Sequence, residues 1–388
     1  MVAQRLYMDW NATAPLLPEA RDACVQALDL LGNPSSVHKE GRAVRMMIEA
    51  ARRDVAALCG ASASSVIFTS GATEAANMVL SPDYRMGKTP LTLGHLYVSA
   101  IEHPAVREGG RFLKAQLSEI PVTAQGIVDI AALAALLDQH DRALGLPMVA
   151  IMMANNETGV VQPIAEAAAL VKSHGGLLVV DAVQAAGRLA LDIEALGADF
   201  LILSSHKLGG PKGAGALVCR GEILMPKPLV HGGGQEKGHR SGTENPVAIA
   251  GFAAAACAAR DRLAAGIDSM ARLRDKIETT MRARAPDVMI HGVGTPRIGN
   301  TSFFTLPGLK SETGQIAFDL EGVALSAGAA CSSGKVGQSH VLTAMGLDAD
   351  LGGLRLSIGP STTTEDADRF LAAFEKIASR RKPVACVA

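Results

Sequence analysis

The stretch from 199 to 215, DFLILSSHKLGGPKGAG, decides how the rest of the sequence is interpreted. Its apolar run Phe200–Leu203 is short, which is typical of a buried strand. The run ends at Ser204, Ser205, His206 and Lys207, and a turn rich in glycine and proline follows. Open α/β sheets bind ligands at the carboxyl ends of their strands, and burial there can make a lysine amine nucleophilic. Lys207 is therefore a candidate for a Schiff base with a carbonyl cofactor; the alternative is an ordinary solvated loop lysine.

Length and composition favour a globular protein of two domains. The chain has 388 residues, 48% of them hydrophobic, and a net charge of −1, so no bulk nucleic-acid or membrane partner is expected. No apolar run reaches the roughly 20 residues of a membrane helix, and the N-terminus lacks the pattern of a signal peptide. The six cysteines form no CxxC pair. We therefore expect a cytoplasmic protein with reduced thiols and no metal site.

Short apolar runs alternate with helical segments through the first two thirds of the chain. This alternation predicts an α/β fold with a mostly parallel sheet covered by helices on both faces. Polar residues should then gather at one edge, where the parallel strands end. The runs expected to be strands are 66–69, 97–101, 149–153, 177–180 and 200–203.

The pattern of the sequence changes after Pro286: the alanine-rich helical segment ends, and short strands alternate with helices. We expect a large cofactor-binding domain over residues 16–260. A smaller C-terminal α+β domain is expected over 261–388, and the N-terminal strand of residues 1–15 is expected to join it. One strand of this domain is predicted at Ala324–Ser326 and another at Leu354–Ile358.

The turn Ser70-Gly71-Ala72-Thr73 lies between an expected strand and an expected helix. Free backbone N–H groups and the helix dipole make such a turn suitable for phosphate, and Thr73 can add a hydroxyl. A plain helix N-cap is the alternative, and the turn matches neither of the common nucleotide-binding motifs.

Asp181 ends the apolar run 177–180, where a partly desolvated carboxylate needs a cationic partner. A protonated pyridine ring would serve, as in pyridoxal phosphate enzymes; an N-cap is the alternative. Lys207 follows after 207 − 181 = 26 residues, the length of one strand–helix–strand unit, so both groups can face one pocket. His103 follows another strand end and can stack on a flat ring. Further short polar groups expected at this edge are Asn155, Gln184, Ser204 and His206, each of which could also be a loop residue.

Two residues of the second domain have chemical potential. Cys331 lies in the loop SAGAACSSG (326–334), where small neighbours would leave the thiol accessible as a nucleophile. Arg355 is a charge within an apolar strand and suits a substrate carboxylate. An incidental loop cysteine and an internal ion pair are the alternatives.

Taken together, these motifs resemble the NifS/IscS-type cysteine desulfurases of the class V branch of fold-type I pyridoxal phosphate enzymes. The likeness runs nearly end to end, through YMDWNATAP (7–15), NPSSVH (33–38), TSGATEAAN (69–77), IEHPAV (101–106), NNETG (155–159), DAVQ (181–184), SSHKLGGPKGAGAL (204–217), RSGTENP (240–246) and SAGAACSSG (326–334). The order of so many motifs makes the resemblance specific.

The resemblance implies that Lys207 binds the cofactor covalently, that Asp181 pairs with the pyridine nitrogen and Gln184 with the phenolic oxygen, and that His103 stacks on the ring. The phosphate would contact Ala72, Thr73, Ser204 and His206, with Thr243 coming from the second subunit of a homodimer. Asn155 and Arg355 would bind the substrate carboxylate. Cys331 would accept the sulfur.

The implied reaction converts L-cysteine to L-alanine and passes sulfur through a persulfide on Cys331 to acceptor or iron–sulfur scaffold proteins. Ala327 and Ala329 stand where serines are common in the family, and Gly359-Pro360-Ser361 replaces a basic residue, which leaves the acceptor open. A selenocysteine lyase or a class V aminotransferase is the alternative on the same fold.

Overall fold

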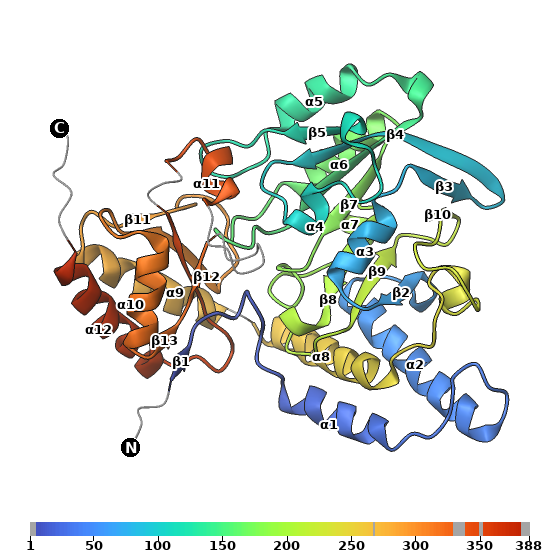
Figure 1. Cartoon of the computed structure of the whole chain (residues 1–388), viewed down its shortest axis with the longest axis horizontal. Coiled ribbons are helices and arrows are strands. Elements are labelled where there is room, and N and C mark those ends of the chain that lie inside the picture. The colour runs from blue at the N-terminus through green and yellow to red at the C-terminus, as the bar shows by residue number, and fades with distance from the viewer. Residues whose placement is uncertain (1–4, 267, 329–337, 349–351, 382–388) are drawn as a thin grey trace.

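A nine-stranded sheet forms the centre of the larger of two lobes in the computed structural model, which describes residues 5–266, 268–328, 338–348 and 352–381 (Figure 1). The strands follow the order β10 (Leu224–Pro226), β3 (Asp83–Met86), β4 (Thr89–Ser99), β6 (Leu146–Met152), β7 (Leu177–Asp181), β8 (Phe200–Ser204), β9 (Gly215–Cys219) and β2 (Val66–Thr69), with β5 (Leu117–Ile120) also paired to β4.

The central strands β4, β6, β7 and β8 are parallel, as predicted. Two features were not foreseen. β9 is antiparallel to both β8 and β2, so β2 again points the same way as β8. The hairpin β3–β4, with Gly87 at φ +60° in its turn, extends the sheet at the other edge.

Helices cover both faces of this sheet because its central strands are fully buried and apolar. One face carries α2 (Lys39–Leu58), α5 (Ile130–Asp138), α6 (Ile164–Ser173), α7 (Ile193–Leu196) and α8 (Pro246–Ala265), with α1 (Pro18–Leu28) against α8. The opposite face carries α3 (Ala72–Val79) and α4 (Pro104–Arg107).

The smaller lobe has its own apolar core, built around stacked phenylalanines such as Phe318 and Phe370. Its antiparallel sheet has the order β11 (Met289–Ile290), β12 (Thr301–Thr305), β15 (Leu354–Ser357) and β14 (Ser326–Ala327). Its helices are α9 (Asp268–Arg284), α10 (Ser311–Leu320), α11 (His340–Ala344) and α12 (Thr364–Arg380). Both described chain ends lie on this lobe (Figure 1).

The N-terminal strand β1 (Leu6–Tyr7) pairs in parallel with β13 (Val323–Ala324), and Leu6 and Met8 belong to the smaller core. The strand predicted at 324–326 is two short strands, because the chain passes from one sheet to another at Leu325. α8 continues to Ala265, so a division at residue 260 would fall inside a helix; the domain bounds stay a prediction.

Asn11 fixes the N-terminal segment where the two lobes meet. Its side chain is fully buried, and its amide nitrogen donates to Thr301 Oγ1 of the smaller lobe (2.9 Å) and to the Asn156 carbonyl of the larger lobe (3.3 Å). Its amide oxygen accepts from Asn300 (3.0 Å). The segment is therefore held by both lobes at once.

None of the helices in the described residues has the length and apolar character of a membrane span.

A methyl group at Gly215 should destabilise the larger lobe. A Cβ there would lie 2.6 Å from the backbone carbon of Gly71 and 2.7 Å from the Leu203 carbonyl oxygen, and neither backbone atom can move freely. We expect Gly215→Ala to lower the free energy of unfolding by about 1–3 kcal/mol, measured by urea denaturation. Gly221→Ala is the matched control, because no described atom lies within 4 Å of its added Cβ. Equal stability of the two variants would contradict the packing argument.

Candidate active site

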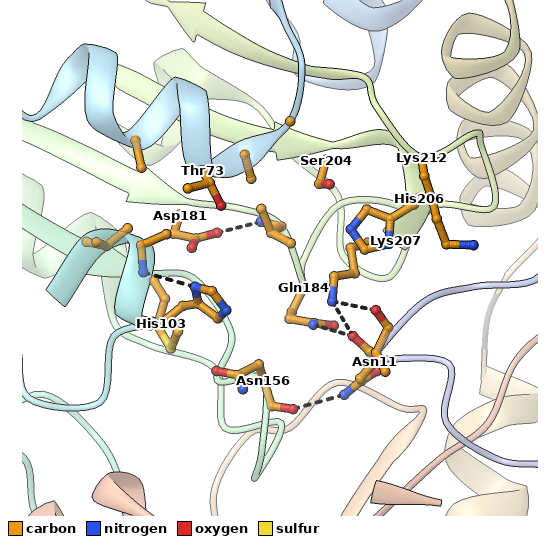
Figure 2. A pocket seen from close by; sticks show the side chains of 18 of the residues that line it. Asn11, Thr73, His103, Asn156, Asp181, Gln184, Ser204, His206, Lys207 and Lys212 are labelled. Atoms are coloured by element: carbon orange, nitrogen blue, oxygen red, sulfur yellow. Dashed lines mark hydrogen bonds between the residues drawn. The ribbon is translucent and has the colours of Figure 1, made fainter. Parts of the chain in front are cut away.

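The carboxyl ends of β2, β4, β6, β7 and β8 meet at a cavity of about 540 Å³ between the lobes. Figure 2 shows the polar side chains that these ends contribute. Of the sequence-predicted residues, those that line the cavity are Ala72, Thr73, His103, Asp181, Gln184, Ser204, His206, Lys207 and Arg355. The parallel sheet thus brings together residues that are far apart in the sequence.

Lys207 follows β8, at the end of a single 3₁₀ turn (Ser205–Lys207). Its Nζ donates to the backbone carbonyl oxygens of Asn11 (2.6 Å) and Ala12 (2.9 Å), as Figure 2 shows. These carbonyls belong to the N-terminal segment, whose sequence did not indicate a role for them. They aim the ε-amine into the cavity.

Asp181 is the last residue of β7 and is 9% exposed. Its Oδ1 accepts from the backbone N–H of Val183 (2.9 Å). Burial raises the pKa of its carboxyl to about 6, and the Val183 N–H and the charge of Lys207 only partly oppose this effect. A carboxyl group in this state gains free energy when a cation comes beside it.

Glu102 is a second buried carboxyl at the same sheet edge, and it was not singled out from the sequence as functional. Its Oε1 accepts from the backbone N–H of Met152, whose pairing partner on β7 is Asp181. Its Oε2 has no hydrogen-bond partner among the described residues. Burial, and next the charge of Asp181, hold the pKa of Glu102 well above its ordinary value. Glu102 therefore favours its neutral form, which limits repulsion of Asp181.

Two histidines face the cavity as neutral rings. His103 caps α4, and its Nδ1 accepts from the Ala105 N–H (3.2 Å), so the ring proton is assigned to Nε2. Burial lowers the pKa of His103 to about 4, and the charge of Lys207 contributes. The pKa of His206 is lowered to about 4 for the same two reasons, and its Nδ1 lies 3.1 Å from Thr13 Oγ1.

The start of α3 is open towards the cavity. Gly71 is the N-cap residue, and it provides no side-chain cap to the first N–H groups of the helix. The Glu74 carboxylate accepts from the Ser70 N–H (2.8 Å) and forms an ion pair with Arg240. These two contacts fix the turn before the helix. The amides of Ala72 and Thr73, together with Ser204, form a site suited to an anion.

Gln184 and Asn156 line the cavity, whereas Asn155, in the turn after β6, does not. Gln184 Nε2 donates to the Asn11 carbonyl (3.1 Å) beside Lys207. Asn155 is fully buried, and its Oδ1 accepts from the N–H groups of Glu157 (2.9 Å) and Thr158 (2.8 Å). Asn155 therefore shapes its own turn, and the next residue, Asn156, lines the cavity. The ligand role of Asn155 stays a prediction.

Arg355 reaches the cavity from β15 and is 3% exposed. Its Nη1 donates to the Asn156 carbonyl (3.0 Å), and its Nη2 pairs with Asp9 Oδ1 (2.8 Å). Its Nε has no hydrogen-bond partner in the described part of the molecule. The guanidinium is held by both lobes and retains donor capacity for a carboxylate.

Besides Asn155, two predicted residues are not among the described residues that line this cavity. Cys331 lies outside the described residues. Thr243 is exposed and does not line the cavity of its own chain.

Glu157 lies close to residues on both sides of the segment that contains Cys331. Ser339 Oγ donates to Glu157 Oε2 (2.6 Å), and a Cβ on Gly328 would lie 2.9 Å from the same oxygen. Burial raises the pKa of Glu157 to about 7.

The donor set fits pyridoxal phosphate on observations of the site itself. A buried carboxyl with a raised pKa can pair with the pyridine nitrogen, and the open start of α3 can bind the phosphate. The amine of Lys207 and the guanidinium of Arg355 line the same cavity. The cavity volume of about 540 Å³ accommodates the cofactor together with an amino acid.

Comparison with known proteins agrees with this geometry. Residues 6–370 match the model of the class-V aminotransferase family. The IscS-like cysteine desulfurase of Mycobacterium tuberculosis is 36% identical over 391 residues, covering 98% of each chain. A cysteine desulfurase of Cereibacter sphaeroides is 38% identical, over 95% of this chain and 94% of the relative. The structure of a NifS-like protein from Rickettsia africae superposes with a TM-score of 0.86 at 33% identity, over 97% of this chain and 100% of that one.

The family match extends through both lobes, and the relatives match over nearly their full length. The predicted fold, family and cofactor are thereby confirmed. The chain belongs to the class-V aminotransferase family of pyridoxal phosphate-dependent enzymes.

Proposed function

We propose that this enzyme is a cysteine desulfurase that converts L-cysteine to L-alanine and transfers the sulfur to Cys331. The observation that carries the proposal is the placement of the Lys207 amine, the Asp181 carboxyl and the Arg355 guanidinium around one cavity. The relatives that match this chain over nearly their whole length are named cysteine desulfurases.

Three residues would hold and orient the cofactor in this function. Lys207 would bind it covalently, Asp181 would pair with its pyridine nitrogen, and the neutral ring of His103 would stack on it. Bound pyridoxal phosphate supplies the electron sink that allows the Cα–H bond of an amino acid to ionise. Lys207, released when the substrate amine takes its place, would accept the Cα proton within the cavity.

Arg355 would bind the carboxylate of the substrate. The guanidinium already donates to Asp9 through Nη2 and to the Asn156 carbonyl through Nη1, so its plane is fixed before substrate arrives. Each of these two nitrogens carries a second N–H, and a substrate carboxylate would accept from those. This pre-organisation reduces the entropy lost when the substrate binds.

Cys331 would accept the sulfur. Its thiolate attacks the sulfur of the substrate, the substrate C–S bond breaks, and Cys331 carries the sulfur as a persulfide. The electron pair of the broken C–S bond stays with the three-carbon remainder, which takes up a proton at Cβ and leaves as alanine. We infer that a sulfur-acceptor protein, such as an iron–sulfur scaffold, then takes the sulfur from Cys331.

A homodimer in the cytoplasm is part of the same proposal. Thr243 is exposed on its own chain, and the phosphate-binding start of α3 has room for a further donor. In a dimer, Thr243 of one protomer would complete the phosphate site of its partner. The cysteines form no CxxC pair, and the four in the described residues are free thiols, which supports a reducing compartment.

Lys207→Ala should abolish both the visible absorption of the bound cofactor and all turnover, because no other amine of the described residues lies at the same place in the cavity. Lys212→Ala is the matched control. Lys212 also lines the cavity, but its amine points away from Asp181 in Figure 2. Spectra of the two purified variants test the assignment. A visible band that persists in Lys207→Ala and disappears in Lys212→Ala would reverse it.

Asp181→Asn should stabilise the cofactor-free protein while removing its function. The folded-state pKa of about 6 exceeds the ordinary 3.8, so the folded protein binds this proton more tightly than the unfolded chain does. The proton on the Asp181 carboxyl stabilises the folded state. This stabilisation is fully present below about pH 4 and is lost as the pH rises through about 6. Asparagine does not ionise, so the variant should be more stable by up to about 3 kcal/mol at pH 8, with no gain near pH 4.

The measurement is urea unfolding of both proteins without cofactor at pH 4 and pH 8. The loaded variant should also fail to exchange the α-proton of cysteine with solvent. A variant that is less stable than the wild type at pH 8, or one that exchanges this proton normally, would contradict the role of Asp181.

Cys331→Ala should separate the two halves of the reaction. The variant should still bind cysteine and exchange its α-proton, because Lys207, Asp181 and Arg355 are unchanged. It should release neither alanine nor sulfide, because no thiolate takes the sulfur. Cys257→Ala, on the half-buried face of α8, is the control and should keep full activity.

Mass spectrometry of the wild type after one turnover without reductant should find one added sulfur on Cys331. Full desulfurase activity in Cys331→Ala, or the sulfur on another cysteine, would overturn the role of Cys331 and reopen the selenocysteine lyase and aminotransferase alternatives. Those reactions need no thiol at this position.

A further inference from the structure

Arg188 is a buried cation behind the cavity, and neither the sequence motifs nor the proposed function assign it a role. It is 7% exposed. Its guanidinium forms no ion pair with a carboxylate in the described part of the chain, and burial lowers its pKa to about 10, with Arg355 and Arg262 adding to the effect. A buried charge without an anionic partner is costly, so its hydrogen bonds must be specific.

All three of those hydrogen bonds go to the two residues beside the cofactor site. Arg188 Nη1 donates to the backbone carbonyl of Gln184 (2.8 Å) and to its side-chain Oε1 (3.0 Å). Nη2 donates to the backbone carbonyl of Lys207, at 3.5 Å. The guanidinium thus contacts the backbone of both residues and the side-chain amide of Gln184, and both residues line the cavity.

These contacts decide which end of the Gln184 amide faces the cavity. A guanidinium has only N–H donors, so it can face the amide oxygen and not the amide nitrogen. The Asn11 carbonyl oxygen accepts from Nε2 at the other end (3.1 Å). A rotation of the amide by half a turn would set donor against donor at Arg188 and oxygen against oxygen at Asn11. Gln184 therefore presents an N–H group to the cavity.

We propose that Arg188 is a positioning residue for the cofactor, which keeps Gln184 oriented as a hydrogen-bond donor to the phenolic oxygen of pyridoxal phosphate. The inference rests on the proposed function and on the pairing of Gln184 with that oxygen, which the resemblance to the cysteine desulfurases implies. An N–H donor draws electron density from the phenolic oxygen, which disfavours protonation of the nitrogen that links Lys207 to the cofactor. A carbonyl oxygen in the same place would repel the phenolic oxygen and favour that protonation.

The readout is the pH midpoint of the visible absorption band of the bound cofactor, which reports that protonation without any turnover. Arg188→Met removes both the donors and the charge, and the midpoint should rise by about one pH unit, the worth of one lost hydrogen bond. Arg188→Gln is the matched control: it is neutral but can still donate to Gln184 Oε1. Its midpoint should stay within about 0.3 unit of the wild type.

A double-mutant cycle with Gln184→Ala tests whether Arg188 acts through that amide. Gln184→Ala alone should raise the midpoint by about as much as Arg188→Met, and the two together should raise it no further. If Arg188→Met does not fold, Arg188→Ala takes its place in the cycle, because it also removes every donor and leaves room for water.

Two results would overturn the inference. One is a midpoint that rises equally in Arg188→Met and Arg188→Gln, which would assign the effect to the lost charge. The other is an Arg188→Met shift that persists in the Gln184→Ala background. A wild type with no visible band at all would instead contradict the proposed function, so the two failures are distinguishable.

Discussion

The common direction of five strands is the constraint on which the site depends. β4, β6, β7 and β8 are parallel, and β2 points the same way because the antiparallel β9 separates it from β8. Each strand therefore delivers its following turn to one edge of the sheet. The pairing of these strands aligns their ends, so four features meet there: the open helix start after β2, His103 after β4, Asp181 at the end of β7 and Lys207 after β8.

This constraint explains how much could be predicted from the sequence. Strand ends followed by polar residues are a local pattern, so the amino-acid sequence was sufficient to assign Asp181, Lys207 and the Ser70–Thr73 turn to one edge. The direction of β9 could not be predicted, because an apolar five-residue run has the same pattern in either direction. Nothing in the sequence indicated that position 215 must be glycine. A side chain is excluded there only because β9 passes close to the backbone of Gly71 in the folded protein.

The residues that sequence reasoning missed act through contacts between distant segments. Asn11 and Ala12 provide carbonyls to Lys207, and nothing in YMDWNATAP indicates this use of the backbone. Arg188 and Glu102 are charged residues in ordinary-looking turns, and only their burial marks them as unusual. Asn155 and Asn156 are adjacent and chemically identical. Their separate placement, one inside the turn and one on the cavity wall, depends on backbone geometry that composition does not encode.

The two lobes must keep a fixed relation for the chemistry to work, since Lys207 belongs to one lobe and Arg355 to the other. The Asn11 backbone accepts from Lys207, while its side chain bonds to Thr301 and Asn300 of the smaller lobe. Arg355 in turn donates to the Asn156 carbonyl of the larger lobe. These buried hydrogen bonds run in both directions across the boundary, so a movement of one lobe would leave polar groups unpaired on both sides. The amine and the guanidinium are therefore held at a set separation. A fixed relation between the two groups is what orienting one substrate between them requires.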